Sequence, residues 1–423
     1  MIRLIGTLLL SGFTLLASPC EEGRLRFAGQ EIIYTYQRSS ASKSAPLLIL
    51  LPGDPVADLT AAKTLCERWQ MATVPREWHL LVPWDGSARG DCTDDRMKAL
   101  EAIVLDACRL LPVDTTRIYL AGYAASSSQV FYAVSRMPDL WAAALAFGGS
   151  PQPAIDTNCF FGVNASQVPF LWVLRKQEQE ALAALRNKLA AKGFSPTIPS
   201  REDFTVKDAL DWLEERVRPT LPSKVDCETG NLSFARCYWA EITKFDITLR
   251  NDVLDFTRVQ AGARAYLDLG EFGFSLTASG PGILVTWLPN SYKGPLKLND
   301  RIVALAGRPI RDVADYQSMM EGLKEERSVG IIIERDGKRQ RVETRILLPK
   351  SPGEDATVRL QAEYLPQFDE VQIISRGVAG LRLRLPSTWI PCRINWNGEE
   401  AAKIDRAGCW ILSYGSGAGP CDR

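Results

Sequence analysis

Histidine is nearly absent from this sequence, with one residue, His79, among 423. This scarcity excludes a metal site built from several histidines and leaves one imidazole for every reaction that needs such a base. Net charge is absent as well, because 50 Lys and Arg residues balance 50 Asp and Glu residues. Without a net positive charge, the composition gives no reason to expect binding to nucleic acid or to an anionic membrane surface. No Cys-x-x-Cys motif occurs, which disfavours zinc or thioredoxin-like redox sites, and we expect neither metal nor cofactor.

Long apolar runs are confined to the N-terminus. Residues 1–19 place Arg3 before a short apolar stretch and end in small residues, which is typical of a secretory signal peptide. The alternative is a buried first strand or helix. Cys20 follows, but Pro19 stands where a lipobox has a small residue, which disfavours lipidation. We expect a periplasmic or secreted protein with no stable membrane span in the mature chain, where its ten cysteines can pair.

Strands and helices alternate along the first half of the chain. The pattern predicts strands over 26–36, 46–51, 78–84, 117–122, 142–147 and 168–174, and helices over 60–72, 94–111, 126–137, 178–192 and 206–217. Such alternation indicates a doubly wound, mostly parallel sheet. Beyond Pro222 strands dominate, with one helix over 313–324.

Residues 113–151, VDTTRIYLAGYAASSSQVFYAVSRMPDLWAAALAFGGSP, carry the clearest motif. They resemble the α/β-hydrolase family, especially secreted esterase-like members, and the resemblance extends over roughly residues 25–220. The matching positions are Asp114, Arg117, Ile118, Tyr119, Gly122, Gly148 and Gly149. The resemblance implies an α/β-hydrolase-like domain over 20–220, with a serine nucleophile on a sharp strand-to-helix elbow.

The elbow departs from the family pattern. Its first, third and fifth positions are Gly122, Ala124 and Ser126, so the nucleophile position has no oxygen. The family's acid position, within 175–178, has no aspartate, and the loop 194–204, where the histidine belongs, has no histidine. His79 begins a core strand, at the end opposite the usual active site. Because each missing triad member costs orders of magnitude in rate, we expect no catalytic residue.

The serines beside the elbow allow two interpretations, a non-standard nucleophile or a structural role at the start of a helix. Ser126, Ser127 and Ser128 follow it directly, and the competing hypothesis is a serine esterase or peptidase with a non-standard nucleophile among them. Small hydroxyl residues also suit the start of a helix, and we expect these three to serve there.

Residues 255–350 resemble a PDZ domain. The matching motifs are Phe272-Gly273-Phe274, the strand GILVTW, Leu298-Asn299-Asp300-Arg301-Ile302, Gly307-Arg308-Pro309, a helix and a strand with Arg335-Asp336-Gly337. The resemblance implies that a peptide, a protein C-terminus or an extended segment adds a strand to the edge 274–278, facing a helix over 313–323. The implied binding residues are Gly270, Glu271, Phe272, Gly273, Phe274, Ser275, Leu276, Val313, Tyr316 and Met320.

The loop 270–273 would offer backbone amides to a terminal carboxylate. Glu271 adds a negative charge there, which weakens that capture unless the side chain turns outward. The alternative is a degenerate module that only packs against its neighbours, in which Phe272 and Phe274 are ordinary core residues.

The segments 221–250 and 355–423 together resemble a small β-sandwich accessory domain of some esterases, with Tyr238-Trp239 and the turn Asn397-Gly398 in matching places. The resemblance implies a PDZ-like module inserted into a split β domain; the alternative is a serial arrangement. Cys227 and Cys237 flank one predicted turn and are candidates for a disulfide, as are two of Cys392, Cys409 and Cys421. Free buried thiols are the alternative.

The predicted fold class is therefore an α/β doubly wound (α/β-hydrolase-like) domain plus a PDZ-like α+β module and a small all-β (sandwich-like) domain. The predicted function is that of an extracytoplasmic, non-catalytic hydrolase-like protein that binds a peptide or protein partner through a PDZ-like groove. Besides the esterase or peptidase alternative, a purely structural protein with a filled groove stays open.

Overall fold

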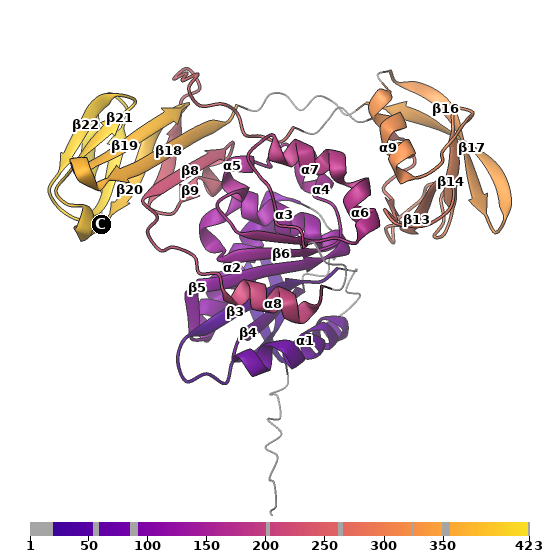
Figure 1. Cartoon of the computed structure of the whole chain (residues 1–423), viewed down its shortest axis with the longest axis horizontal. Coiled ribbons are helices and arrows are strands. Elements are labelled where there is room, and N and C mark those ends of the chain that lie inside the picture. Colours follow the sequence, from indigo (N-terminus) through magenta and orange to yellow (C-terminus); the bar gives the residue numbers. More distant parts are fainter. Residues whose placement is uncertain are drawn as a thin grey trace, which may run out of the picture.

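The computed structural model describes residues 20–53, 59–84, 92–199, 204–260, 265–323, 325–348 and 356–421. We refer to residues 20–221 as the α/β unit, to 265–348 as the middle module, and to 222–260 with 356–421 as the β unit (Figure 1). The predicted signal peptide lies outside the described residues. No helix among those residues is both long and apolar enough to cross a membrane.

The α/β unit is built on one seven-stranded sheet. Its strands are β1 (Glu21–Phe27), β2 (Gln30–Gln37), β3 (Ala45–Leu51), β4 (His79–Trp84), β5 (Val113–Tyr123), β6 (Ala143–Phe147) and β7 (Phe170–Val173), in the order β1-β2-β4-β3-β5-β6-β7. Strands β4, β3, β5, β6 and β7 are parallel neighbours, as the sequence predicted, and β2 joins β4 antiparallel. The single strand predicted over 26–36 is wrong, because Ala28 and Gly29 take positive φ and turn the chain into a hairpin.

Helices cover both faces of this sheet. One face packs against α1 (Leu59–Thr73) and α8 (Val206–Glu214), and the other against α2 (Asp94–Leu110) and α3 (Ser127–Arg136). Leu48 and Leu50 point into the first core, whereas Leu47 and Ile49 point into the second. This alternation explains why β3 is apolar at every position: a parallel strand buried on both faces has no polar side. The helix predicted over 178–192 is two, α6 (Lys176–Ala181) and α7 (Ala183–Ala190).

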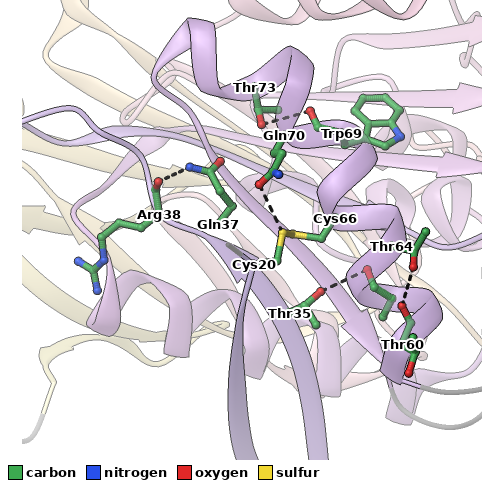
Figure 2. Close-up of a disulfide and its surroundings, with 11 residues drawn as sticks. Cys20, Thr35, Gln37, Arg38, Thr60, Thr64, Cys66, Trp69, Gln70 and Thr73 are labelled. Atoms are coloured by element: carbon green, nitrogen blue, oxygen red, sulfur yellow. Dashed lines mark hydrogen bonds between the residues drawn. A yellow bond between two sulfur atoms is a disulfide. The ribbon is translucent and has the colours of Figure 1, made fainter. Parts of the chain in front are cut away.

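A disulfide ties the start of the described chain to the first helix. Cys20 is bonded to Cys66 of α1, and its sulfur also lies 3.9 Å from the Gln70 side-chain oxygen (Figure 2). Closing a loop of this length is worth about 4 kcal/mol in the chain-entropy account. Bonded in this way, Cys20 has no thiol free for a lipid. Two disulfides, this one and Cys409–Cys421, are typical of proteins outside the reducing cytosol.

The β unit consists of two five-stranded sheets that share one core. The first sheet contains β9 (Arg236–Cys237), β10 (Ala240–Phe245), β20 (Val378–Leu385), β23 (Gly408–Ser413) and β24 (Gly417–Pro420), and the second contains β8 (Lys224–Thr229), β18 (Val358–Leu365), β19 (Glu370–Arg376), β21 (Cys392–Trp396) and β22 (Glu399–Ile404). Strand β8 pairs with β18 and β10 with β20, so segments on either side of the middle module meet in both sheets. Asn397 and Gly398, both at positive φ, form the predicted turn between β21 and β22.

The cysteines of the β unit pair only in part as predicted. Cys409–Cys421 is a disulfide, while Cys392 is buried and free. Cys227 and Cys237 are also buried and free, although their thiols lie in hydrogen-bonding contact. Burial raises the pKa of the Cys237 thiol well above its ordinary value. The predicted Cys227–Cys237 disulfide is wrong for this structure, in which both thiols are free.

The middle module is a mostly antiparallel sheet with one helix. Its elements are β11 (Tyr266–Leu267), β12 (Gly273–Phe274), β13 (Ile283–Trp287), β14 (Arg301–Leu305), β15 (Arg308–Pro309), α9 (Val313–Gly322), β16 (Arg327–Arg335) and β17 (Lys338–Leu347). The sheet order is β11-β17-β16-β14-β13-β12, with β15 beside β14. Because β11 pairs with β17, the first and last strands of the module are neighbours.

One buried carboxylate ties together the two chain segments of the β unit that flank the middle module. Glu228, fully buried on β8, accepts hydrogen bonds from the Thr257 backbone amide (2.6 Å), the Thr257 hydroxyl (2.8 Å) and the Thr357 hydroxyl (2.6 Å). Thr257 precedes the middle module in the chain and Thr357 follows it. The Arg376 guanidinium lies 3.5 Å from the same carboxylate, and the Asn164 side chain, from the α/β unit, donates to the Glu228 backbone carbonyl. Glu228 therefore holds both connections of the module.

Candidate functional site

The predicted elbow is present at the carboxyl end of β5. The chain leaves the strand at Tyr123 and turns at Ala124, whose φ of +45° lies in the left-handed region. This conformation costs an alanine about 1–2 kcal/mol. Gly122 and Ser126 meet there as expected, since a Cβ on Gly122 would lie only 2.9 Å from the Ser126 carbonyl oxygen. The turn is thus left-handed, and its exposed side chain at Ala124 is a methyl group, which has no oxygen.

The three serines after the elbow are buried and bonded to backbone carbonyls. The Ser126 hydroxyl lies 3.0 Å from the carbonyl oxygens of both Leu51 and Tyr123, and it accepts the Tyr123 amide. The Ser127 and Ser128 hydroxyls lie next to carbonyls of β5, β6 and the elbow. These hydroxyls thus bind backbone groups of β3, β5, β6 and the elbow, and none of them projects from the elbow. Ser126 is the N-cap residue of α3 but makes no side-chain capping bond there, so the predicted capping role is wrong for it.

His79 lies far from the elbow and is fully buried. Its Nδ1 accepts the Ser39 amide at 2.9 Å, and its Nε2 lies 3.3 Å from the Pro112 carbonyl oxygen. Burial lowers the pKa of His79, so the ring is neutral at pH 7, with both nitrogens in backbone contacts. His79 aligns through β3 with Ile118, six residues before Ala124, which separates it from the elbow by roughly 20 Å along the strands.

A carboxylate that the sequence reasoning missed lies at the sheet edge beside the elbow. Glu178 follows β7 on α6, is buried, and would lie 3.2 Å from a Cβ placed on the neighbouring Gly148. Its partners are the Arg175 amide (2.9 Å) and the Arg175 guanidinium (3.3 Å). The spacing of Arg175 and Glu178, with an acidic residue at the third helical position, was the signal for this helix-capping arrangement. The carboxylate is thus held by an arginine, not by an imidazole.

The edge strand predicted over 274–278 is shorter in the structure. Strand β12 ends at Phe274, and its outer edge has no strand partner among the described residues. After it, the Ser275 hydroxyl accepts the backbone amides of Thr277 (3.2 Å) and Ala278 (3.0 Å). These bonds turn the chain away from the extended conformation, because a serine side chain competes with a strand ladder for backbone donors. The backbone available for pairing is therefore limited to residues near Phe274.

The predicted carboxylate loop, residues 270–273, leads into β12 and ends at the first residue of that strand, Gly273. Gly270 has φ +76°, and a Cβ there would lie 3.0 Å from the Tyr292 ring. The Tyr292 hydroxyl donates to the Leu269 carbonyl, which fixes the start of the loop. Glu271 is exposed, so its charge lies on the solvent side of the loop.

The predicted helix residues lie beneath the edge instead of lining an open surface. Val313, Tyr316 and Met320 are all buried in the core of the middle module. Tyr316 meets Phe274 edge to face, with ring centroids 5.7 Å apart. Phe272, Phe274 and Leu276 are half-buried over the same core. The apolar side chains of the edge and the helix are thus in contact with each other in this structure.

The middle module touches the α/β unit beside Glu178. The Arg175 guanidinium donates to the Thr277 hydroxyl at 3.2 Å, and Leu276 packs against the cores of both units. The two predicted sites therefore lie close together, joined through Arg175. The described residues contain no group of three His, Cys, Asp or Glu side chains arranged to hold a metal ion.

Neither a protein-family model nor a curated protein sequence matches the chain. Among solved structures it is similar to a thermostable esterase (16% identity, TM-score 0.38, 47% of this chain and 64% of that chain). It is also similar to the acylaminoacyl peptidase of Pyrococcus horikoshii (11%, 0.36, 49% and 43%) and to the S-formylglutathione hydrolase FrmB of Staphylococcus aureus (13%, 0.35, 46% and 98%). The matches span under two thirds of the first two proteins and concern the fold alone. In the structure itself, the α/β unit makes up about half of the chain and a separate β-rich region makes up the rest.

Proposed function

We propose that this chain is an exported, non-catalytic hydrolase-like protein that binds a peptide or protein terminus at the middle module, which we take to be PDZ-like. The observation that carries the proposal is the unpaired outer edge of β12, which follows a glycine-containing loop and lies against α9 through the Phe274–Tyr316 contact. Such an edge offers main-chain hydrogen bonds to an added strand. The short length of β12 restricts that pairing to the last few residues of a ligand.

The elbow supports the non-catalytic half of the proposal. An acyl-transfer enzyme needs a nucleophile within reach of a base. Here Ala124 occupies the elbow, while Ser126 donates to carbonyl oxygens and His79 lies at the opposite end of the sheet. Two disulfides and the signal-like N-terminus support export, and the two sheets of the β unit fit the proposed sandwich-like domain.

Terminal-carboxylate recognition gives the first prediction. Peptides selected on the full chain should lose at least about tenfold in affinity when their C-terminal carboxylate is amidated, since a charge-assisted hydrogen bond is worth about 1.5–3 kcal/mol. Glu271→Lys should tighten binding of the acid form only, because it replaces a negative charge on the loop with a positive one. Fluorescence polarisation with labelled peptides measures both effects.

The matched control is Glu343→Lys, which makes the same charge change at an exposed residue of β17, across the sheet from β12. It should leave affinity unchanged. The loop does not recognise a C-terminal carboxylate if amidated peptides bind as tightly as the acid forms and if Glu271→Lys changes the affinity no more than Glu343→Lys does.

A second candidate function is serine hydrolysis, and the backbone of the elbow favours it. Ala124 keeps the left-handed turn that presents the nucleophile in α/β-hydrolases. We expect a fluorophosphonate probe to leave both the natural chain and an Ala124→Ser variant unlabelled, because no imidazole lies near the elbow to activate a hydroxyl. Gel fluorescence and intact mass measure the labelling, with a serine esterase as the positive control. Labelling of the natural chain that is lost in Ser126→Ala would make the protein a hydrolase.

A further inference from the structure

A pocket lies between the α/β unit and the β unit, away from the elbow and from β12. Its volume is about 440 Å³, within the range of roughly 300–1,000 Å³ typical of small-molecule sites. Its lining includes two apolar residues, Leu105 on α2 and Ile118 in the middle of β5, together with Tyr238, Arg218, Arg236 and Arg384. Ile118 precedes Ala124 of the elbow by six residues, which separates the two by roughly 20 Å along the strand.

Two of the three arginines have acidic partners. Arg236 is paired with Asp139 at 2.6 Å and with Glu101 at 3.1 Å, so its charge is balanced within the protein. Arg384 lies 3.5 Å from Glu241, but that carboxylate is closer to Arg382, at 2.7 Å. One carboxylate therefore serves two guanidinium groups at this rim.

Arg218 differs from both. Its guanidinium nitrogens meet only carbonyl oxygens, those of Thr115 at 3.1 Å and Pro219 at 3.4 Å, and it forms no ion pair within the described part of the chain. Its Nε is buried and has no hydrogen-bond partner there. Of the three arginines in the lining, Arg218 is thus the one without a carboxylate partner among the described residues.

Tyr238 adds a neutral aromatic wall beside this charge. The Arg218 guanidinium lies 6.0 Å from the centre of its ring. Burial raises the pKa of Tyr238 to about 12, so its hydroxyl keeps its proton and can donate a hydrogen bond. Leu105, which also lines the pocket, is 50% exposed and offers apolar surface to an occupant. A guanidinium without a carboxylate partner, a phenol and apolar side chains suit an anion carried on an apolar body.

We infer that this pocket binds a small organic anion, a carboxylate on an apolar ring, with the carboxylate on Arg218 and the ring between Tyr238 and Leu105. This site is independent of the terminus-binding function proposed above, because none of its residues lies in the middle module. An occupied pocket would also bridge the α/β unit and the β unit.

The experiment compares two probes that differ only in charge. Isothermal titration of the full chain with 1-naphthoate should show one site, and the neutral 1-naphthamide should bind at least about tenfold more weakly. Arg218→Gln should weaken naphthoate by a similar factor and leave naphthamide unchanged. Arg339→Gln, at an exposed arginine of β17, is the matched control and should change neither.

A second pair of variants tests the apolar wall. Leu105→Asp should abolish naphthoate binding, whereas Leu298→Asp, at a leucine that is 57% exposed in the middle module, should not. The inference is overturned if naphthoate does not bind, if naphthamide binds equally well, or if Arg218→Gln and Leu105→Asp leave binding intact. Displacement of naphthoate by an equal concentration of inorganic phosphate would overturn it too, since the apolar body would then contribute nothing.

Discussion

Replacing Glu228 by alanine is expected to lower the free energy of unfolding by about 3–5 kcal/mol, the usual loss when one partner of a buried ion pair is removed. The carboxylate is fully buried, and its removal would leave the Thr357 hydroxyl and the Thr257 amide without their acceptor. It would also leave the Arg376 guanidinium without its acidic partner. Burial already lowers the pKa of Arg376, and its guanidinium lies 3.6 Å from the centre of the Phe256 ring. Both connections of the middle module would loosen at once.

Urea denaturation followed by tryptophan fluorescence measures this loss. Glu363→Ala is the matched control, because Glu363 lies in the same sheet, on β18, with its side chain 42% exposed and its Lys224 partner 3.7 Å away. We expect it to change stability by less than about 1 kcal/mol, as surface pairs do. A loss at Glu228 no larger than at Glu363 would show that the buried network does not hold the connections.

The second large effect is expected at Gly149. A Cβ at this position would lie 2.0 Å from the Ala124 carbonyl oxygen, and the residue has φ +71°. Gly149→Ala therefore combines left-handed strain of about 1–2 kcal/mol with a steric clash worth about 1–3 kcal/mol more. The clash falls on the backbone of the elbow, which cannot move without disturbing the end of β5. Thermal unfolding followed by circular dichroism measures the change.

Gly193 separates the two contributions. Its φ of +87° is also left-handed, but a Cβ there would meet nothing within 4 Å. Gly193→Ala should therefore show the strain alone. If both alanine variants melt at the same temperature, Gly149 is required for its left-handed backbone conformation. Its close contact with the Ala124 carbonyl oxygen would then contribute nothing measurable to stability.

The strands and helices of the α/β unit could be predicted because each is marked by the residue pattern of its own short segment. Residues 46–51 are apolar at every position, which indicates a strand buried on both faces, and β3 is that strand. The elbow could be placed from Gly122 and Ala124 because a motif with fixed spacing marks it. The left-handed φ of Ala124 could not be predicted from alanine's own preferences, since the surrounding packing imposes it.

Features that depend on individual side-chain hydrogen bonds or on distant segments could not be predicted. The edge at β12 was expected to run to Ala278, but one hydroxyl, that of Ser275, ends it by binding two amides. The position of Glu178 beside Gly148 could not be predicted, because it depends on how α6 follows β7. The position of Arg218 in the pocket is visible only once segments more than 100 residues apart in sequence have been brought together.

The bonds from Glu228 to its two threonines also make the stability of the β unit depend on whether the middle module is folded. Thr257 and Thr357 are separated by about 100 residues, and closing a flexible loop of that length costs on the order of 4 kcal/mol. The folded middle module removes most of this cost, because β11 and β17 pair and bring its ends together. If the module alone melts, the β unit must close the whole loop through Glu228. The module therefore acts on its host as a reversible cross-link, even though it adds no strand to either sheet of the β unit.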